Sequence, residues 1–164
     1  MTGEAIHVTS ICGMRIRSVR DEDYAALARL RRQTIRNVNN SDYPEDTIRN
    51  WSAKVRAQDF RESADSCMRW VALDGNRITG FCEHNFAGEI SRIYVHKDYL
   101  RKGVGSRLLK LAEESLKKHG CTEIRVESTV TAKEFYEKNG YKVVENATHK
   151  EDNSLIHRML KAPY

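Results

Sequence analysis

Several short runs of the chain alternate between apolar and polar residues, whereas other stretches repeat their apolar residues at helical spacing. The alternation in residues 14–20 (MRIRSVR) predicts a first strand. Asp21 can cap a helix that follows it and that carries an apolar stripe. Arg31 interrupts this stripe, which indicates a helix face that is not wholly buried. The stripe consists of Tyr24, Leu27, Ala28, Ile35 and Val38.

The middle of the chain predicts a second helix and then a meander of strands. Residues 45–57 have helical periodicity, and the polar residues 58–66 are expected to form a loop or a short helical turn. Two β-rich runs in residues 67–86 flank an Asp-Gly-Asn sequence, which is a strong hairpin signal. Residues 88–95 (GEISRIYV) predict the next strand.

The last third alternates between helices and strands. Residues 104–119 predict an amphipathic helix, and residues 122–128 predict a strand. A short helix is expected at residues 131–140, followed by strands at residues 141–146 and 154–161. Because a strand–helix–strand unit makes its two strands parallel, the prediction is a mixed α/β (α+β) fold. Its sheet is mostly antiparallel and is flanked by helices.

Length and composition fit one domain. The chain has 164 residues, of which 40% are hydrophobic and 31% charged. Residues 14–164 are expected to form the domain, and residues 1–13 a flexible tail without clear periodicity. No run is long enough to span a membrane and no secretory signal is evident, so we expect a cytoplasmic protein. The net charge of +5 is spread along the chain, which does not favour a nucleic-acid or membrane partner.

The cysteine pattern argues against a metal site. The four cysteines are widely spaced, with no Cys-x-x-Cys pair and no histidines at ligand spacing. Reduced thiols, no structural disulfide and no metal are therefore expected.

Residues 96–106 (HKDYLRKGVGS) connect a strand to a helix through a basic turn. The turn lacks the Gly-Lys-Ser/Thr order of a P-loop and the third glycine of a dinucleotide fingerprint. Gly103 and Gly105 allow backbone N–H groups to approach an anion, with Arg101 and Lys102 beside them. The turn can therefore cradle a diphosphate, although the glycines could also serve only to make the turn tight.

Residues 88–114 and 131–144 (TAKEFYEKNGYKVV) resemble the two halves of the acetyl-CoA signature of the GNAT superfamily of N-acetyltransferases. The resemblance covers about residues 14–160. It implies the GNAT fold, in which a parallel pair of strands splays apart, and acetyl-CoA as co-substrate. It also implies direct attack by a primary amine in a ternary complex. Leu100 stands where the family has Gln or Arg, and Thr129 where many members have Asn.

The resemblance also implies roles for individual residues. Tyr136 matches the general acid, although it could simply be a packed aromatic residue. Glu89 matches a general base of the histone-acetylating branch, although it could be a solvated charge at a hairpin end. Glu83 and His84 are alternative bases, and a relayed water would also serve. The residues expected to bind the cofactor are Ile93, Tyr94, Val95, Arg101, Lys102, Gly103, Val104, Gly105, Ser106 and Lys133.

The acceptor is expected to contact the two front helices, the hairpin at residues 83–88 and the loop at residues 147–154. It could be a small-molecule amine or a protein amine, attracted by the acidic residues of this region. A non-catalytic acyl-CoA sensor on the same fold is the alternative function, and either a monomer or a homodimer is compatible with the sequence. The acidic residues are Asp42, Glu45, Asp46, Glu83 and Glu89.

Overall fold

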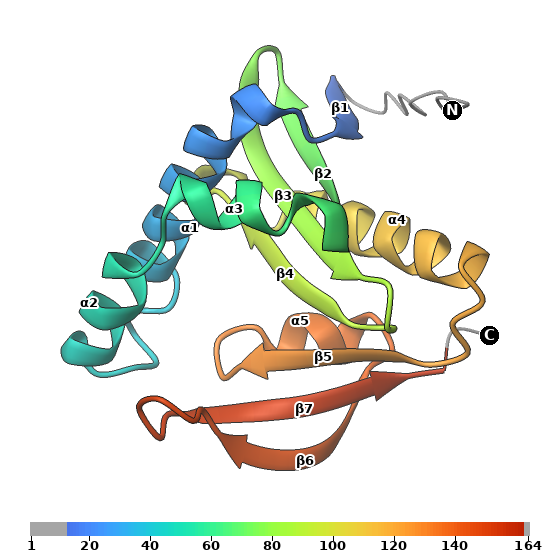
Figure 1. The fold of residues 1–164 in the computed structure, drawn as a ribbon. Helices are drawn as coiled ribbons and strands as arrows, with labels where there is room; N and C mark the ends of the chain where they lie inside the picture. The colour runs from blue at the N-terminus through green and yellow to red at the C-terminus, as the bar shows by residue number, and fades with distance from the viewer. Residues whose placement is uncertain (1–12, 163–164) are drawn as a thin grey trace.

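The computed structural model describes residues 13–162, so the expected tail at residues 1–13 lies outside the described residues except for Gly13. A four-stranded antiparallel sheet has the order β1–β2–β3–β4 (Figure 1). Its hairpin between β2 and β3 turns at the Asp-Gly-Asn sequence, as predicted. The strands are β1 (Met14–Ser18), β2 (Cys67–Asp74), β3 (Arg77–Asn85) and β4 (Ile90–Val95).

A second sheet has three antiparallel strands in the order β5–β7–β6. The C-terminal strand therefore inserts between the two strands that flank the short helix α5. The strands are β5 (Ile124–Thr129), β6 (Lys142–Thr148) and β7 (Leu155–Lys161).

The two sheets meet where β4 and β5 run parallel. Glu89 and Arg125 form an isolated parallel bridge, and the Arg125 amide donates to the Gly88 carbonyl at 2.8 Å. Beyond this point the strands diverge and open a V between them (Figure 1). The prediction of a mixed fold with a parallel, splayed strand pair is confirmed.

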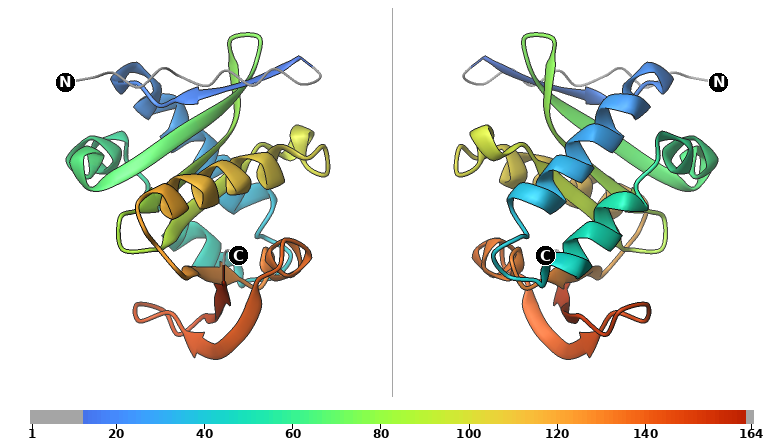
Figure 2. Two further views of the ribbon diagram at one scale, coloured as in Figure 1. Left: turned by 90° about the vertical axis from the view of Figure 1, so that its right-hand side faces the viewer. Right: turned by 90° about the vertical axis from the view of Figure 1, so that its left-hand side faces the viewer.

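Helices cover both faces of the larger sheet (Figure 2). Alternation along β3 separates two apolar cores, because Cys82 packs with α4 and Phe81 packs with the helices of the opposite face. Helix α4 (Val104–Lys118) covers one face, and α1 (Tyr24–Asn37), α2 (Glu45–Ala53) and α3 (Ala57–Glu62) lie on the other. Helix α5 (Lys133–Lys138) lies beside β5 of the second sheet (Figure 1). Short 3-10 turns are found at Asp21–Asp23, Ala64–Ser66 and Lys97–Tyr99. Within residues 13–162, no helix is both long and apolar enough to cross a bilayer.

Two local predictions were wrong. The helix predicted at residues 45–57 ends at Ala53, because Val55 turns into the core and its carbonyl accepts from the Arg32 guanidinium at 2.8 Å. The chain then forms the short helix α3 and a 3-10 turn, which agrees with the short helical turn that was one of the two expectations for residues 58–66. Asp21 does not cap α1 but lies in a 3-10 turn, and the Asp23 carboxylate accepts the Arg20 amide at 2.8 Å.

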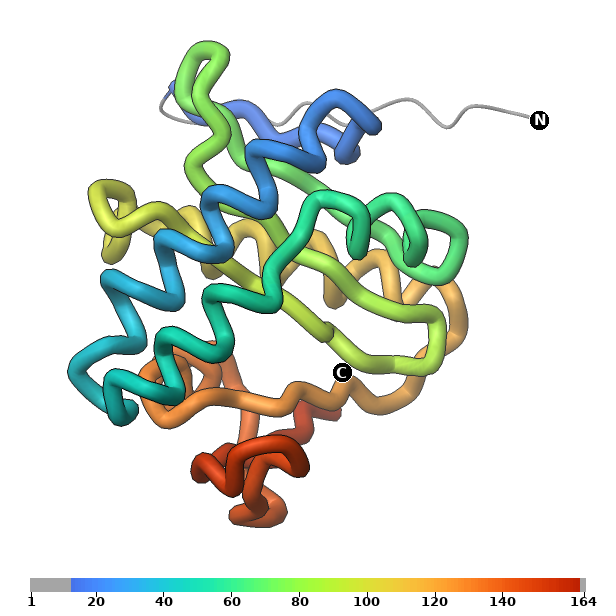
Figure 3. The backbone as a smooth tube through the Cα atoms, turned by 60° about the vertical axis from the view of Figure 1, so that its left-hand side comes forward, coloured from blue at the N-terminus to red at the C-terminus, as the bar shows by residue number. Residues whose placement is uncertain are grey.

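The segment between α1 and α2 closes the wide end of the V (Figure 3). The Asn39 amide donates to the Thr131 hydroxyl at 3.2 Å. The Tyr43 hydroxyl donates to the Leu155 carbonyl at 2.9 Å and accepts from the Val130 amide at 2.7 Å. The N-terminal helices are therefore fastened to the second sheet, and the V has a fixed opening.

Gly88 should be sensitive to substitution. Its φ is +88°, and an added Cβ would lie 3.0 Å from the Glu123 carbonyl oxygen, whereas Gly120 has a φ of +82° with nothing within 4 Å of such an atom. Gly120→Ala should cost about 1 kcal/mol for the left-handed backbone alone. Gly88→Ala should lower the free energy of unfolding by about 1 kcal/mol or more in addition to the loss in Gly120→Ala, because the two sheets must also move apart. Denaturant unfolding of both variants measures the difference, and equal losses would contradict a tight junction.

Candidate active site

The open edge of β4 presents backbone groups to the V. The His96 amide donates to the Thr79 carbonyl at 2.8 Å, on the side of β3. Because successive residues of a strand direct their backbone groups to opposite edges, Ile93 and Val95 direct theirs toward β5. Within the described residues, β5 pairs with β4 only at the Glu89–Arg125 bridge. The polar backbone at Ile93 and Val95 can therefore bind a ligand that lies between the strands.

Tyr94 marks the face of β4 that is turned toward α1. Its ring stacks on Phe81 with centroids 5.5 Å apart, and its hydroxyl accepts from the Arg31 guanidinium at 3.3 Å. Thr34, one turn further along α1, donates its hydroxyl to the Val95 carbonyl at 3.4 Å. Helix α1 thus fixes the strand that faces the opening.

The basic turn before α4 has the conformation of an anion cradle. Arg101 and Gly103 adopt positive φ values of 58° and 81°, and both are exposed. A Cβ on Gly103 would meet nothing within 4 Å, so the space above the first turn of α4 is open. The unsatisfied amides and the positive dipole end of this helix point into that space, and Lys102 is exposed beside it. The turn fits a diphosphate by shape and charge.

Contacts with the β2–β3 hairpin hold this turn in place. The Tyr99 hydroxyl donates to the Asp74 carboxylate at 2.6 Å. The charged groups of Arg77 and Lys102 lie 5.6 and 5.3 Å from the centre of the Tyr99 ring. The Asp98 amide donates to His96 Nδ1 at 3.1 Å. The cradle is therefore attached to a rigid hairpin.

Helix α5 packs against the first turn of α4. An added Cβ on Gly105 would lie 3.2 Å from the Phe135 ring, so only glycine allows this approach without displacement. The Asn139 amide donates to the Ser106 hydroxyl at 3.4 Å, and Lys133 is ion-paired with Glu137 at 3.6 Å. The two halves of the signature are thus in direct contact.

Tyr136 is buried behind the V. Its ring packs between those of Phe135 and Tyr141, at centroid distances of 5.2 and 5.5 Å. Burial raises the pKa of Tyr136, and the nearby Tyr94 and Cys82 raise it further. Tyr136 belongs to the same apolar core as Cys82 of β3 and Val95 of β4. A phenol with a raised pKa stays protonated at neutral pH, as a proton donor must.

Glu89 lies at the narrow end of the V. Its carboxylate accepts from the Asn85 side-chain amide at 3.1 Å, and its own amide donates to the Asn85 side-chain oxygen at 3.1 Å. The residue is half-buried at the parallel bridge with Arg125. The hairpin therefore fixes this carboxylate on the edge that leads to Ile93.

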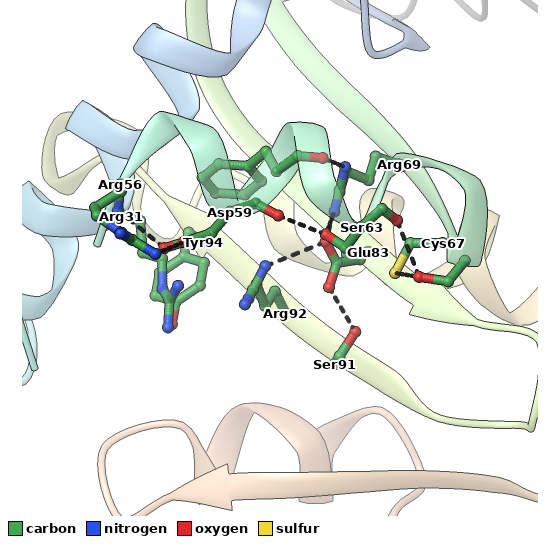
Figure 4. A network of polar contacts seen from close by, with 12 residues as sticks. Arg31, Arg56, Asp59, Ser63, Cys67, Arg69, Glu83, Ser91, Arg92 and Tyr94 are labelled. Carbon is green, nitrogen blue, oxygen red and sulfur yellow. Dashed lines mark hydrogen bonds and ion pairs between the residues drawn. The ribbon is translucent and has the colours of Figure 1, made fainter. Parts of the chain in front are cut away.

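Glu83 is held in a buried ion-pair network (Figure 4). Its carboxylate contacts the guanidinium groups of Arg69 at 2.5 Å and Arg92 at 3.3 Å, and it accepts from the Ser91 hydroxyl at 2.9 Å. Burial alone would raise the pKa of Glu83, but Arg92 and Arg69 outweigh burial and lower it. A carboxylate with a lowered pKa is a weak base.

His84 faces the opposite side of the sheet from Glu83. Its ring is fully buried, with Nδ1 2.7 Å from the Asn85 carbonyl and Nε2 2.9 Å from the Ser115 hydroxyl on α4. Burial lowers the pKa of His84. Because adjacent strand residues point to opposite faces, Glu83 and His84 are not brought together.

The acidic residues expected to attract the acceptor do not form a single site. Glu45 and Asp46 are exposed on α2 and pair with Arg49 at 3.2 and 3.4 Å. In their place, Arg31 of α1 and Arg92 of β4 lie between β4 and the helices α1 and α3. Neither residue was expected from the sequence to belong to the site. The break that Arg31 makes in the apolar stripe was the available signal.

Comparison with known proteins identifies the family. Residues 39–162 match the family described as the acetyltransferase (GNAT) domain. Because the match covers more than half of the chain, the protein belongs to the GNAT acetyltransferases. The predicted resemblance is confirmed.

Individual relatives agree with this assignment. A spermidine N(1)-acetyltransferase of Thermoplasma acidophilum is 27% identical over 143 residues, which cover 79% of this chain and 89% of the relative. The solved PaiA N-acetyltransferase of the same organism, in complex with coenzyme A, has a TM-score of 0.75 at 26% identity over 91% of this chain and 98% of that one. A GCN5-related N-acetyltransferase structure from Rhodopseudomonas palustris has a TM-score of 0.85 at 22% identity over 98% and 99% of the two chains and supports the fold.

The environment of Glu83 predicts a pH dependence of stability. Its folded pKa lies below the ordinary value of 4.5, so its contribution is complete above about pH 4.5 and is lost as the pH falls through the folded pKa. Glu83→Gln should cost about 3 kcal/mol at pH 7, because it leaves Arg69 buried without its carboxylate. The difference in the free energy of unfolding between wild type and variant should become smaller as the pH falls. Denaturant unfolding from pH 7 to pH 3 measures it.

The matched control is Glu114→Gln, an exposed substitution on α4. The free energy of unfolding of this control should differ from that of the wild type by the same amount at every pH in this range. A Glu83→Gln gap that does not change with pH would contradict a charged Glu83 in the folded protein.

Proposed function

We propose that this protein transfers the acetyl group of acetyl-CoA to a primary amine, by direct attack of the amine in a ternary complex. The observation that carries the proposal is the V between β4 and β5, whose open strand edge leads into the anion cradle of α4. The matched family and the coenzyme A complex of a relative support an acyl-CoA ligand.

The residues fit the two ends of acetyl-CoA. Its diphosphate would lie on the turn from Arg101 to Ser106, where Gly103 leaves open space and Val104 and Gly105 provide helix amides. Lys133 stands at the start of α5 and can add positive charge beside this turn. The pantetheine arm would lie along β4, bonded by the backbone of Ile93 and Val95 with Tyr94 between them.

The chemistry follows from the positions of the groups. The amine nitrogen attacks the thioester carbonyl carbon, a C–N bond forms and the C–S bond breaks, and the thiolate takes a proton. A backbone amide on the β4 edge would polarise the carbonyl oxygen. Tyr136, buried and protonated beside β3 and β4, would donate the proton to the thiolate.

Glu89 remains the preferred base that removes the proton of the amine. It lies on the edge of the V, whereas Glu83 is neutralised by arginines and His84 is buried against α4. A water at the backbone carbonyls can relay the proton to Glu89 or replace it.

The proposed acceptor is a small-molecule amine, since one relative is named for acetylation of spermidine. A protein amine is the second possibility. The alternative function, a non-catalytic acyl-CoA sensor, would not need a buried phenol close to β3 and β4, and Tyr136 is such a phenol.

Acetyl-CoA should raise the melting temperature, because a ligand that binds only the folded state stabilises it by about 2.7 kcal/mol at 100 times its Kd. Pantetheine lacks the diphosphate and should give a much smaller shift at the same concentration. Thermal unfolding with each compound measures this. No shift with millimolar acetyl-CoA would contradict the cofactor assignment, and equal shifts would contradict the cradle.

Tyr136→Phe should lower kcat by about 100-fold while acetyl-CoA binding persists, because a general acid contributes on this scale. Tyr141→Phe is the matched control, since it also removes a buried hydroxyl, one that donates to Glu113 at 3.0 Å. That control should affect stability more than turnover. Steady-state release of free CoA measures both, and a normal kcat in Tyr136→Phe would remove Tyr136 as the acid.

A further inference from the structure

The side of β4 that faces α1 and α3 carries an excess of positive charge. Figure 4 shows four arginines, Arg31, Arg56, Arg69 and Arg92, beside this strand. Two carboxylates, Asp59 and Glu83, accompany them. Glu62 acts on Arg56 as a third carboxylate, so four guanidinium groups and three carboxylates leave one positive charge in excess among these residues.

Arg69 is buried and fully bonded within the fold, whereas Arg56 is exposed and pairs with one carboxylate. The side chains of Arg69 and Glu83 are each only 4% exposed, and Arg69 also donates to the Phe60 carbonyl at 2.7 Å and the Ser63 hydroxyl at 2.5 Å. Arg56 pairs with Asp59 at 2.8 Å. Each of these two arginines therefore has its own carboxylate.

The other two arginines provide the excess. Arg92 shares the carboxylate that Arg69 already neutralises, lies over the Phe60 ring at 5.4 Å and keeps 24% of its side chain exposed. Arg31 donates to the Tyr94 hydroxyl at 3.3 Å and lies over that ring at 5.7 Å. The carboxylate near Arg31 is that of Asp59, which already pairs with Arg56. Within residues 13–162, both keep N–H donors that protein carboxylates do not saturate.

Their position links them to the acceptor rather than to the diphosphate. Arg92 directly precedes Ile93, and Tyr94, which binds Arg31, directly follows it. Alternate strand residues are about 6.6 Å apart, so both charges lie near the backbone edge proposed for the thioester. The cradle for the diphosphate lies beyond Val95, at the start of α4.

We infer that Arg31 and Arg92 bind an oxyanion on the acceptor, so that the substrate is an amine that also carries a carboxylate or a phosphate. This inference rests on the proposed acetyl transfer. The planar guanidinium fork matches both groups in two-point contacts. An amino acid, which carries its amine a few bonds from a carboxylate, is one such substrate. A polyamine brings two or more positive charges to a face that is already positive, so spermidine is a poor substrate despite the name of one relative.

The test compares matched amines by release of free CoA. The pairs are L-tyrosine with tyramine and L-histidine with histamine for the carboxylate, and O-phosphoethanolamine with ethanolamine for the phosphate, with spermidine added. The anionic member should have a kcat/KM about tenfold higher or more, because charged hydrogen bonds have this size. The pairs that respond identify the source of the oxyanion.

Variants connect the preference to the two arginines. Arg92→Gln and Arg31→Gln should each lower kcat/KM about tenfold for the member of a pair that carries the oxyanion, and by less than about threefold for the member that lacks it. Arg92→Lys should recover part of the loss. Arg15→Gln, on the opposite edge strand with its guanidinium on the Gly75 carbonyl, is the control and should change neither value. The acetyl-CoA thermal shift verifies that each variant is folded and binds cofactor.

The outcomes separate this inference from the proposed function. Faster reaction of the amines that lack an oxyanion, spermidine included, would overturn the anion site while acetyl transfer stands. Unchanged discrimination in both Arg31→Gln and Arg92→Gln would also overturn it. No CoA release with any amine would contradict acetyl transfer and this inference with it.

Discussion

The single parallel bridge between β4 and β5 is the constraint on which the rest of the structure depends. Gly88 allows the two backbones to approach, and beyond it the strands separate and leave polar groups of Ile93 and Val95 on an open edge. Unpaired strand edges are costly and invite other chains, so a protein that keeps one must control its access. The Tyr43 and Asn39 contacts fix the wide end of the V, and α4 and α5 close its rear. The opening between the two strands is therefore bounded at its wide end and at its rear.

Much of this architecture could be predicted from the sequence because it depends on local signals. The hairpin at Gly75, the glycine turn before α4 and the helical repeat of α4 are each encoded within about ten residues. The break of the second helix was missed because it depends on Arg32, a residue of another helix, which takes the Val55 carbonyl. The insertion of β7 between β5 and β6 likewise follows from pairing across the chain, which no local pattern records.

In the candidate site, too, residues within short motifs could be predicted, whereas contacts between distant parts of the chain could not. The turn from Arg101 to Ser106 and the phenol of Tyr136 could be proposed from the sequence because short motifs carry them. Glu83 was taken for a possible base because its partner Arg69 lies on another strand, 14 residues away, and periodicity gives no sign of that pairing. His84 is adjacent to Glu83 in the sequence, but the two side chains point to opposite faces of β3 and do not form one site. Arg31 could be noticed in the sequence because it is a charged residue within an apolar stripe. Similar breaks can indicate binding residues in other helices that border an opening.

Arg31 and Arg92 also affect the removal of a proton from the amine. A free amine is mostly protonated at neutral pH, and the two nearest alternative bases are unsuited, since Glu83 is neutralised and His84 faces α4. Positive charge close to an amine lowers the pKa of that amine, because it disfavours the charged form. Arg31 and Arg92 would therefore favour the neutral nucleophile while they hold the oxyanion of the same molecule. A site that lowers the pKa of its substrate needs only a modest base, which the half-buried Glu89 or a relayed water can supply.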